Sequence, residues 1–282
     1  MNITNEVFIG APGLINDMAI KKPSYYAYYL LSRLGTEIVT MDEGYIVTKS
    51  EDYYSIDEDY GNIDDLKELI DEAHKRDIKV IMDLVLNHTS TEHPWFKEAS
   101  KDKNSEYRDY YIWTEDMSKI DEISDMDTKR WAKNGDKNEL YNAIFWEGMP
   151  DLNMDNPLVR QEVKDILKFW LDMGVDGFRE DVVTFISKKE GLPDDHIMPA
   201  SKGFGYFNHG PHLHEYLEEF KEDVFSKYNC MTLAEAPMVK PKVALKYIDE
   251  SNNPVLDMMI QFKSQEADCL FVDFNHMPFS LL

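Results

Sequence analysis

The sequence predicts an α/β fold built on a parallel sheet that is either open or closed into a barrel. Apolar residues at helical spacing run from Ile63 to Ala73, and a nearly continuous apolar run follows from Ile78 to Leu86. The same order of helix and then strand recurs twice more, with a weaker fourth copy. Helices that alternate with strands buried on both faces are typical of a parallel sheet with helices packed against it.

The second repeat has clear start and stop signals. Asn156-Pro157 is predicted to open a helix that continues to Trp170 and is ended by Gly174, and a short strand then leads to Asp181. The remaining predicted helices are 213–224 and 243–248, each followed by a predicted strand at 231–235 and 255–262.

Two stretches interrupt this pattern. Residues 89–148 are long, polar and rich in aromatic residues, which indicates a loop-rich inserted subdomain. Its rings either fill a small core or stack on flat sugar faces. Residues 1–50 predict a strand at 7–9, a helix at 22–35 and a hairpin at 37–48.

Charge and cysteine content exclude several functions. The formal net charge is −24 over 282 residues, and a field of that sign repels nucleic acid and anionic lipid. A neutral or cationic ligand fits this charge, as does ordinary acidic solubility. Cys230 and Cys269 lie in apolar runs without a C-x-x-C pair, so neither a disulfide framework nor a metal site is expected.

No targeting or membrane signal is evident. The first residues, MNITNEVFIGAPGL, lack a basic segment followed by a long apolar run, and no apolar run approaches membrane-spanning length. We therefore expect a cytoplasmic protein without membrane partners.

Polar residues stand where the predicted strands end. Arg179 and Asp181 share one face of their strand because side chains alternate, and Glu180 points to the other face. The pair is either a structural ion pair or an oriented nucleophile. Glu235 ends an apolar strand, where partial burial would raise its pKa and suit a general acid. Two such carboxylates about 5–5.5 Å apart are typical of a retaining glycosidase.

Several segments resemble glycoside hydrolase family 13, the α-amylase family. Asp83-Leu-Val-Leu-Asn-His88, Gly177-Phe-Arg-Glu-Asp181 and Leu233-Ala-Glu235 are similar to three of its characteristic regions, in order and spacing. Pro150-Asp-Leu-Asn153 looks like the motif of its oligo-1,6-glucosidase branch, and residues 261–274 are similar to glucan 1,6-α-glucosidases and trehalose-phosphate hydrolases. The resemblance covers residues 51–282.

The resemblance implies a partial (β/α)8 barrel, with the subdomain inserted after its first clear strand, and a retaining mechanism without a cofactor. Asp181 would be the nucleophile, Glu235 the acid/base and Arg179 the residue that keeps the nucleophile ionised. A short oligosaccharide with α-1,6 or α-1,4 bonds would be the substrate. The other residues that would contact or support the glucose are His88, Asn87, Asp83 and Val182.

The chain also departs from the family pattern. No Asn-His-Asp motif, which supplies a third carboxylate, occurs before Leu282, and Gly44-Tyr45 is not followed by the expected aspartate. Glu180 stands where the family usually has an apolar residue, and an unpaired charge there would cost several kcal/mol or stay protonated. Residues 1–50 resemble the end of the barrel and the start of the following β-domain in family 39 β-xylosidases. This predicts a chimera joined near Ser50 to Tyr54, and an unusual but native N-terminus is the alternative.

These departures predict little or no turnover by this polypeptide alone. Two other readings remain: a non-catalytic carbohydrate-binding protein that uses residues 89–148, and an inactive gene fragment. A complementing chain or an oligomer could supply the missing strands.

Overall fold

The computed structural model describes residues 53–56, 61–122, 129–192, 207–237, 239–249, 251 and 253–261. They divide between two compact units: 55–56 and 61–66 belong to one, and the remainder to the other. The predictions for residues 7–9, 22–35 and 37–48, and that for Cys269, lie outside the described residues. The second unit carries the sheet and the inserted subdomain.

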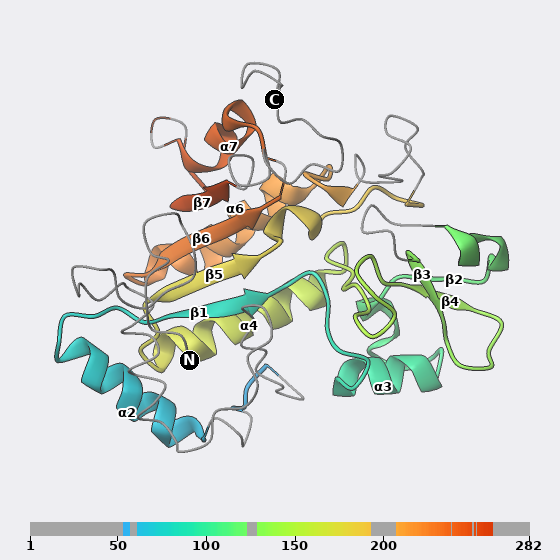
Figure 1. Ribbon diagram of the computed structural model, residues 1–282, viewed down its shortest axis with the longest axis horizontal. Helices are drawn as coiled ribbons and strands as arrows, with labels where there is room; N and C mark the ends of the chain where they lie inside the picture. Colours follow the sequence, from blue (N-terminus) through green and yellow to red (C-terminus); the bar gives the residue numbers. More distant parts are fainter. Residues whose placement is uncertain are drawn as a thin grey trace, which may run out of the picture. The chain divides into compact units, whose positions relative to one another are not determined.

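The central sheet has the predicted parallel order. Its strands are paired as β1-β5-β6-β7, and every pairing is parallel (Figure 1). The strands are β1 (Ile81–Val85), β5 (Gly177–Asp181), β6 (Met231–Ala236) and β7 (Met258–Gln261). The helices between and before them are α2 (Ile63–His74), α4 (Pro157–Asp172), α6 (Leu213–Asp223) and α7 (Pro241–Ile248). All four predicted pairs of helix and strand are confirmed, with shorter first and last strands.

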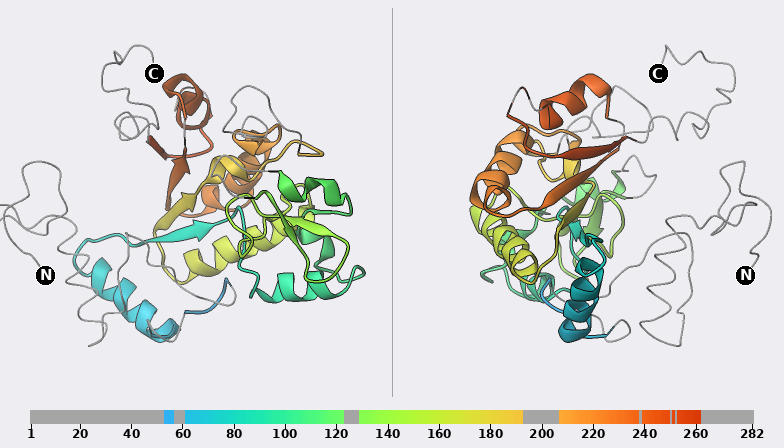
Figure 2. Two further views of the ribbon diagram at one scale, coloured as in Figure 1. Left: turned by 45° about the vertical axis from the view of Figure 1, so that its right-hand side comes forward. Right: turned by 90° about the vertical axis from the view of Figure 1, so that its left-hand side faces the viewer.

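Helices α4 and α6 lie side by side on one face of the sheet (Figure 2). Helix α4 forms where the sequence predicts it, because the Asn156 side chain accepts a hydrogen bond from the Leu158 N–H (2.9 Å) and Pro157 fits the first turn. Its apolar face, including Ile166, Leu167 and Trp170, is buried. Gly174 ends the helix with φ +107°, a conformation that glycine adopts readily.

The prediction that the first strand is buried on both faces is wrong. Leu84 and Leu86 are buried on the helix-covered face, whereas Ile81 and Asp83 on the opposite face are exposed. The reason is that β1 is an edge strand of the described sheet, so its side chains have a neighbouring strand on one side only. Strand alternation still holds, since exposed and buried side chains follow one another along β1.

The inserted subdomain lies beyond the carboxyl end of β1 (Figure 1). It contains α3 (Pro94–Lys101) and an antiparallel sheet ordered β2 (Trp113–Thr114), β4 (Leu140–Asn142) and β3 (Trp131–Lys133). The chain also forms the short 3-10 helices η2 (Arg108–Tyr110), η3 (Met117–Asp121), η4 (Val183–Phe185) and η5 (Phe225–Lys227). The aromatic residues of the inserted subdomain mostly build a core: Tyr110, Tyr111, Trp131 and Tyr141 are buried.

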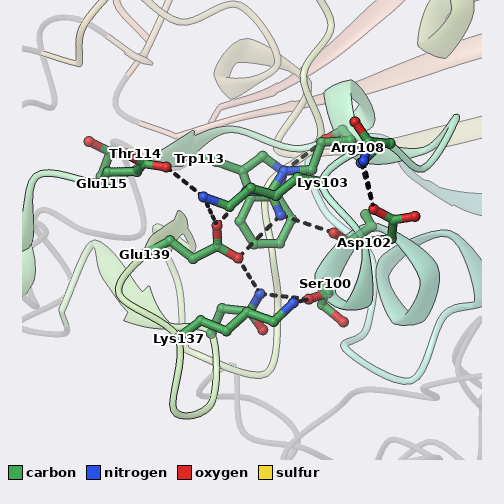
Figure 3. A network of polar contacts seen from close by, with 12 residues as sticks. Ser100, Asp102, Lys103, Arg108, Trp113, Thr114, Glu115, Lys137 and Glu139 are labelled. Carbon is green, nitrogen blue, oxygen red and sulfur yellow. Dashed lines mark hydrogen bonds and ion pairs between the residues drawn. The ribbon is translucent and has the colours of Figure 1, made fainter.

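A buried carboxylate ties this subdomain together (Figure 3). Glu139 is fully buried and binds Arg108 (2.8 Å), Lys103 (3.3 Å) and the Asn134 amide (2.7 Å). Arg108 also stacks on the Trp113 ring, 3.6 Å from its centroid. Although burial alone would raise it, the pKa of Glu139 is lowered to about 2 by these donors.

Two further observations concern the described residues only. Every helix among them is too short or too polar to span a bilayer. No three histidine, cysteine, aspartate or glutamate side chains gather there as metal ligands would.

Candidate active site

Strand register brings the predicted site residues into two rows on the sheet face away from α4 and α6. Asp83 is level with Arg179, and Arg179 is level with Leu233. Two residues further along the strands, Val85 is level with Asp181. Ala234 pairs with Glu180, so the next residues on these two strands, Glu235 and Asp181, are neighbours. Residues level with one another on parallel strands project to the same side, so the two carboxylates end on one face.

Arg179 contacts three carboxylates, those of Asp83, Asp181 and Glu235. Its Nη1 donates to Asp83 Oδ1 (2.6 Å) and to Asp181 Oδ1 (2.6 Å), and its Nη2 binds Glu235 Oε2. Asp181 and Glu235 are mostly buried, with 19% and 14% of their side chains exposed. The structure therefore gathers Asp83, Arg179, Asp181 and Glu235 around one guanidinium group, and the predicted pairing of Arg179 with Asp181 is present.

The electrostatics of Asp181 differ from the expectation in one respect. Burial raises the pKa of the Asp181 carboxyl, Arg179 lowers it, and Asp83 adds a smaller upward effect. The net direction is upward, because the loss of water around the carboxylate outweighs the attraction of the guanidinium. Arg179 thus opposes protonation of Asp181 without bringing its pKa below the ordinary value.

A buried hydrogen-bonded network fixes the segment after β1. Asn87 donates through Nδ2 to Asp151 Oδ1 (3.0 Å) and accepts from Lys188 Nζ (2.9 Å). Asn87, Asp151 and Lys188 are all nearly or completely buried. Burial raises the pKa of Asp151 to about 6 and lowers that of Lys188. The predicted motif at Pro150–Asn153 therefore serves to hold Asn87.

His88 lies beside this network and against the ring of Phe145. Burial and the charge of Lys188 lower the pKa of His88 to about 4, so its imidazole is neutral at pH 7. Its ring contacts Phe145 edge-on at 5.4 Å between centroids, and Phe145 stacks on Phe185 at 5.9 Å. A neutral imidazole can donate one hydrogen bond, as recognition of a sugar hydroxyl requires.

Val182 occupies the next position after Asp181 in an unusual conformation. Its φ is +35°, which is strained for a β-branched residue, and only 7% of it is exposed. It packs with Ile144, Phe185 and Phe207, and Phe145 lies against this cluster. Strained backbone of this kind is concentrated at functional sites.

Glu180 points to the helix-covered face, as predicted. It is 1% exposed, and its Oε2 has no hydrogen-bond partner among the described residues. Burial, with a smaller contribution from the Asp257 charge, raises its pKa to about 8. The side chain is therefore mostly protonated at pH 7 and takes no part in the face that carries Asp181.

The family description of the alpha-amylase catalytic domain matches residues 37–278. The chain belongs to the alpha-amylase family. It is 41% identical to the oligo-1,6-glucosidase of Parageobacillus thermoglucosidasius, over 84% of this chain and 44% of that protein. It is 39% identical to trehalose-6-phosphate hydrolase of Bacillus subtilis (strain 168), over 80% of this chain and 40% of that protein.

Solved structures agree with this assignment. Trehalose-6-phosphate hydrolase of Bacillus licheniformis superposes with a TM-score of 0.71 at 38% identity, over 82% of this chain and 42% of that one. Isomaltulose synthase of Erwinia rhapontici NX5 superposes with a TM-score of 0.70 at 34% identity, over 76% of this chain and 38% of that one. The fold is thus that of an alpha-amylase catalytic barrel, of which this chain forms a part. The chain spans less than half the length of these relatives.

Two site residues escaped sequence analysis. Lys188 stands in a polar run with Lys189, which resembles an exposed loop, and nothing in its local pattern shows that it is buried. Phe145 precedes an exposed tryptophan and carries no motif. The match of Pro150–Asn153 to a branch motif was the one signal that pointed to this region.

Proposed function

We propose that this chain carries the catalytic pair of a retaining α-glucosidase that acts on short oligosaccharides with α-1,6 bonds. The observation that supports this most is the placement of Asp181 and Glu235 on one sheet face, joined by Arg179. Family membership and relatives named oligo-1,6-glucosidase favour this substrate over other glycosides. Asp83, Asn87, His88 and Val182 are proposed to shape the glucose site.

The reaction would proceed in two displacements. The Asp181 carboxylate attacks the anomeric carbon while the glycosidic C–O bond breaks and Glu235 gives its proton to the leaving oxygen. Water then attacks the same carbon, Glu235 takes the proton of that water, and the bond to Asp181 breaks. One water is consumed, and the glucose released keeps the α configuration.

The contact of Arg179 with Glu235 has a consequence for this mechanism. A carboxylate paired with a guanidinium is stabilised in its ionised form, whereas a general acid must carry a proton. The substrate therefore has to separate Glu235 from Arg179 before the first displacement. This requirement supports slow turnover.

The test uses the purified chain with p-nitrophenyl α-glucoside and with isomaltose. We expect slow release of α-glucose, abolished by Asp181→Asn. Glu235→Ala should lose activity that added azide partly restores, because azide needs no general base. Release of β-glucose first, or activity unchanged in Asp181→Asn, would refute the proposal.

A second candidate is a carbohydrate-binding protein without turnover. The exposed ring of Trp146 in the inserted subdomain favours it, because an aromatic ring can bind a sugar without any catalytic group. Calorimetry with isomaltose distinguishes the two, since binding without product indicates the second. A cytoplasmic location remains a prediction.

A further inference from the structure

Several large hydrophobic side chains of the described residues are exposed, and among these Trp146 is the one aromatic residue. It is 58% exposed, while most other aromatic residues of the inserted subdomain are buried or half-buried. An exposed indole presents a large, flat apolar area.

A tight turn holds this indole in place. The Met149 N–H donates to the Trp146 carbonyl (2.8 Å), and the Tyr141 hydroxyl donates to the Glu147 carbonyl (2.7 Å). The ring lies against Gly148, where a Cβ atom would overlap it. One flat face of the indole is thus covered by the glycine backbone, and the exposed area belongs to the remainder of the ring.

The turn borders the candidate active site. The Thr91 N–H donates to the Gly148 carbonyl (3.0 Å), which ties the turn to the segment that follows His88. Phe145, the residue before Trp146, contacts the His88 ring. The turn that carries the indole is therefore linked to the His88 segment both by this backbone hydrogen bond and through Phe145.

We propose that Trp146 is a stacking platform for a second sugar ring, on the leaving-group side of the glucose that the proposed function places at Asp181 and Glu235. The C–H face of a pyranose is flat and apolar, and it matches the exposed indole face. A neutral sugar also suits a chain with a net charge of −24, which repels anionic partners. This proposal rests on the proposed function, because it needs a first glucose in the site.

Calorimetry with isomaltotriose and with methyl α-glucoside tests the proposal. Every protein carries Glu235→Gln to prevent turnover. We expect Trp146→Ala to weaken isomaltotriose binding about tenfold, equivalent to about 1.4 kcal/mol. Binding of methyl α-glucoside should change less than about twofold, because that ligand has no second ring. Trp146→Phe should retain most of the affinity for the trisaccharide.

A matched control separates the platform from general surface effects. Leu158 is equally exposed on α4, so Leu158→Ala should leave both affinities unchanged. If Trp146→Ala binds isomaltotriose as tightly as its parent while methyl α-glucoside still binds, the platform is refuted and the proposed function stands. If the parent binds neither sugar, both proposals fail.

Discussion

Replacing Glu180 with glutamine should make the protein less sensitive to pH. Glu180 is 1% exposed on the helix-covered face, and Asp257 is the charged group that acts on it. Its pKa is raised from 4.5 to about 8, so the native state keeps a proton that the unfolded chain releases above pH 4.5. Below pH 4.5 the bound proton contributes its full stabilisation to the free energy of unfolding. This contribution falls as the pH rises from 4.5 to about 8, and above pH 8 it changes little.

The size of the effect follows from the same two pKa values. One pKa unit corresponds to about 1.4 kcal/mol, so the gap between 4.5 and about 8 amounts to about 5 kcal/mol of unfolding free energy. Glutamine keeps the shape of protonated glutamate without the titrating group. The difference in stability, Glu180→Gln minus wild type, should therefore grow by about 5 kcal/mol between pH 4 and pH 9.

Urea unfolding followed by tryptophan fluorescence at half-unit pH intervals measures this difference. Other titrating groups are shared by the two proteins and cancel in the subtraction. Glu222→Gln, at an exposed position on α6, is the control and should give a flat difference. A flat difference for Glu180→Gln as well would mean that the buried side chain is solvated or paired in solution, and the reasoning would be wrong.

Three further substitutions test the scaffold around the site. Glu139→Gln should destabilise the chain by about 3 kcal/mol at pH 7, because Arg108 loses its buried charged partner. The difference in unfolding free energy between the two proteins should disappear as the pH falls from 4.5 toward 2, because Glu139 of the wild type is then protonated as well. Lys188→Met should destabilise the chain by about 3 kcal/mol in urea unfolding, because the buried Asp151 loses its cationic neighbour. NMR titration should show the pKa of Asp151 above about 6, since one of the effects that lower it is removed while burial still raises it. An unchanged pKa would contradict this. Gly177→Ala should cost more than about 1 kcal/mol, because φ is +153° and a Cβ would overlap the neighbouring strand; equal melting temperatures would refute it.

The sequence by itself determined the order of the elements and the facing of side chains along each one. Helical spacing in α2 and α4, the caps at Asn156 and Gly174, and the opposite directions of Arg179 and Glu180 all follow from bonded geometry within a few residues. These features could be predicted without knowing what packs against them. The family motifs added the identity of the candidate carboxylates.

Tertiary structure decided what those side chains meet. The register between β5 and β6 places Glu235 next to Asp181. Such a register is set by contacts between residues far apart in the chain. The same holds for Lys188, which is buried only because Asn87 and Asp151 arrive from other segments, and for the one-sided burial of β1. Trp146 and its buried aromatic neighbours look alike in the sequence, since local patterns do not encode which ring the fold covers.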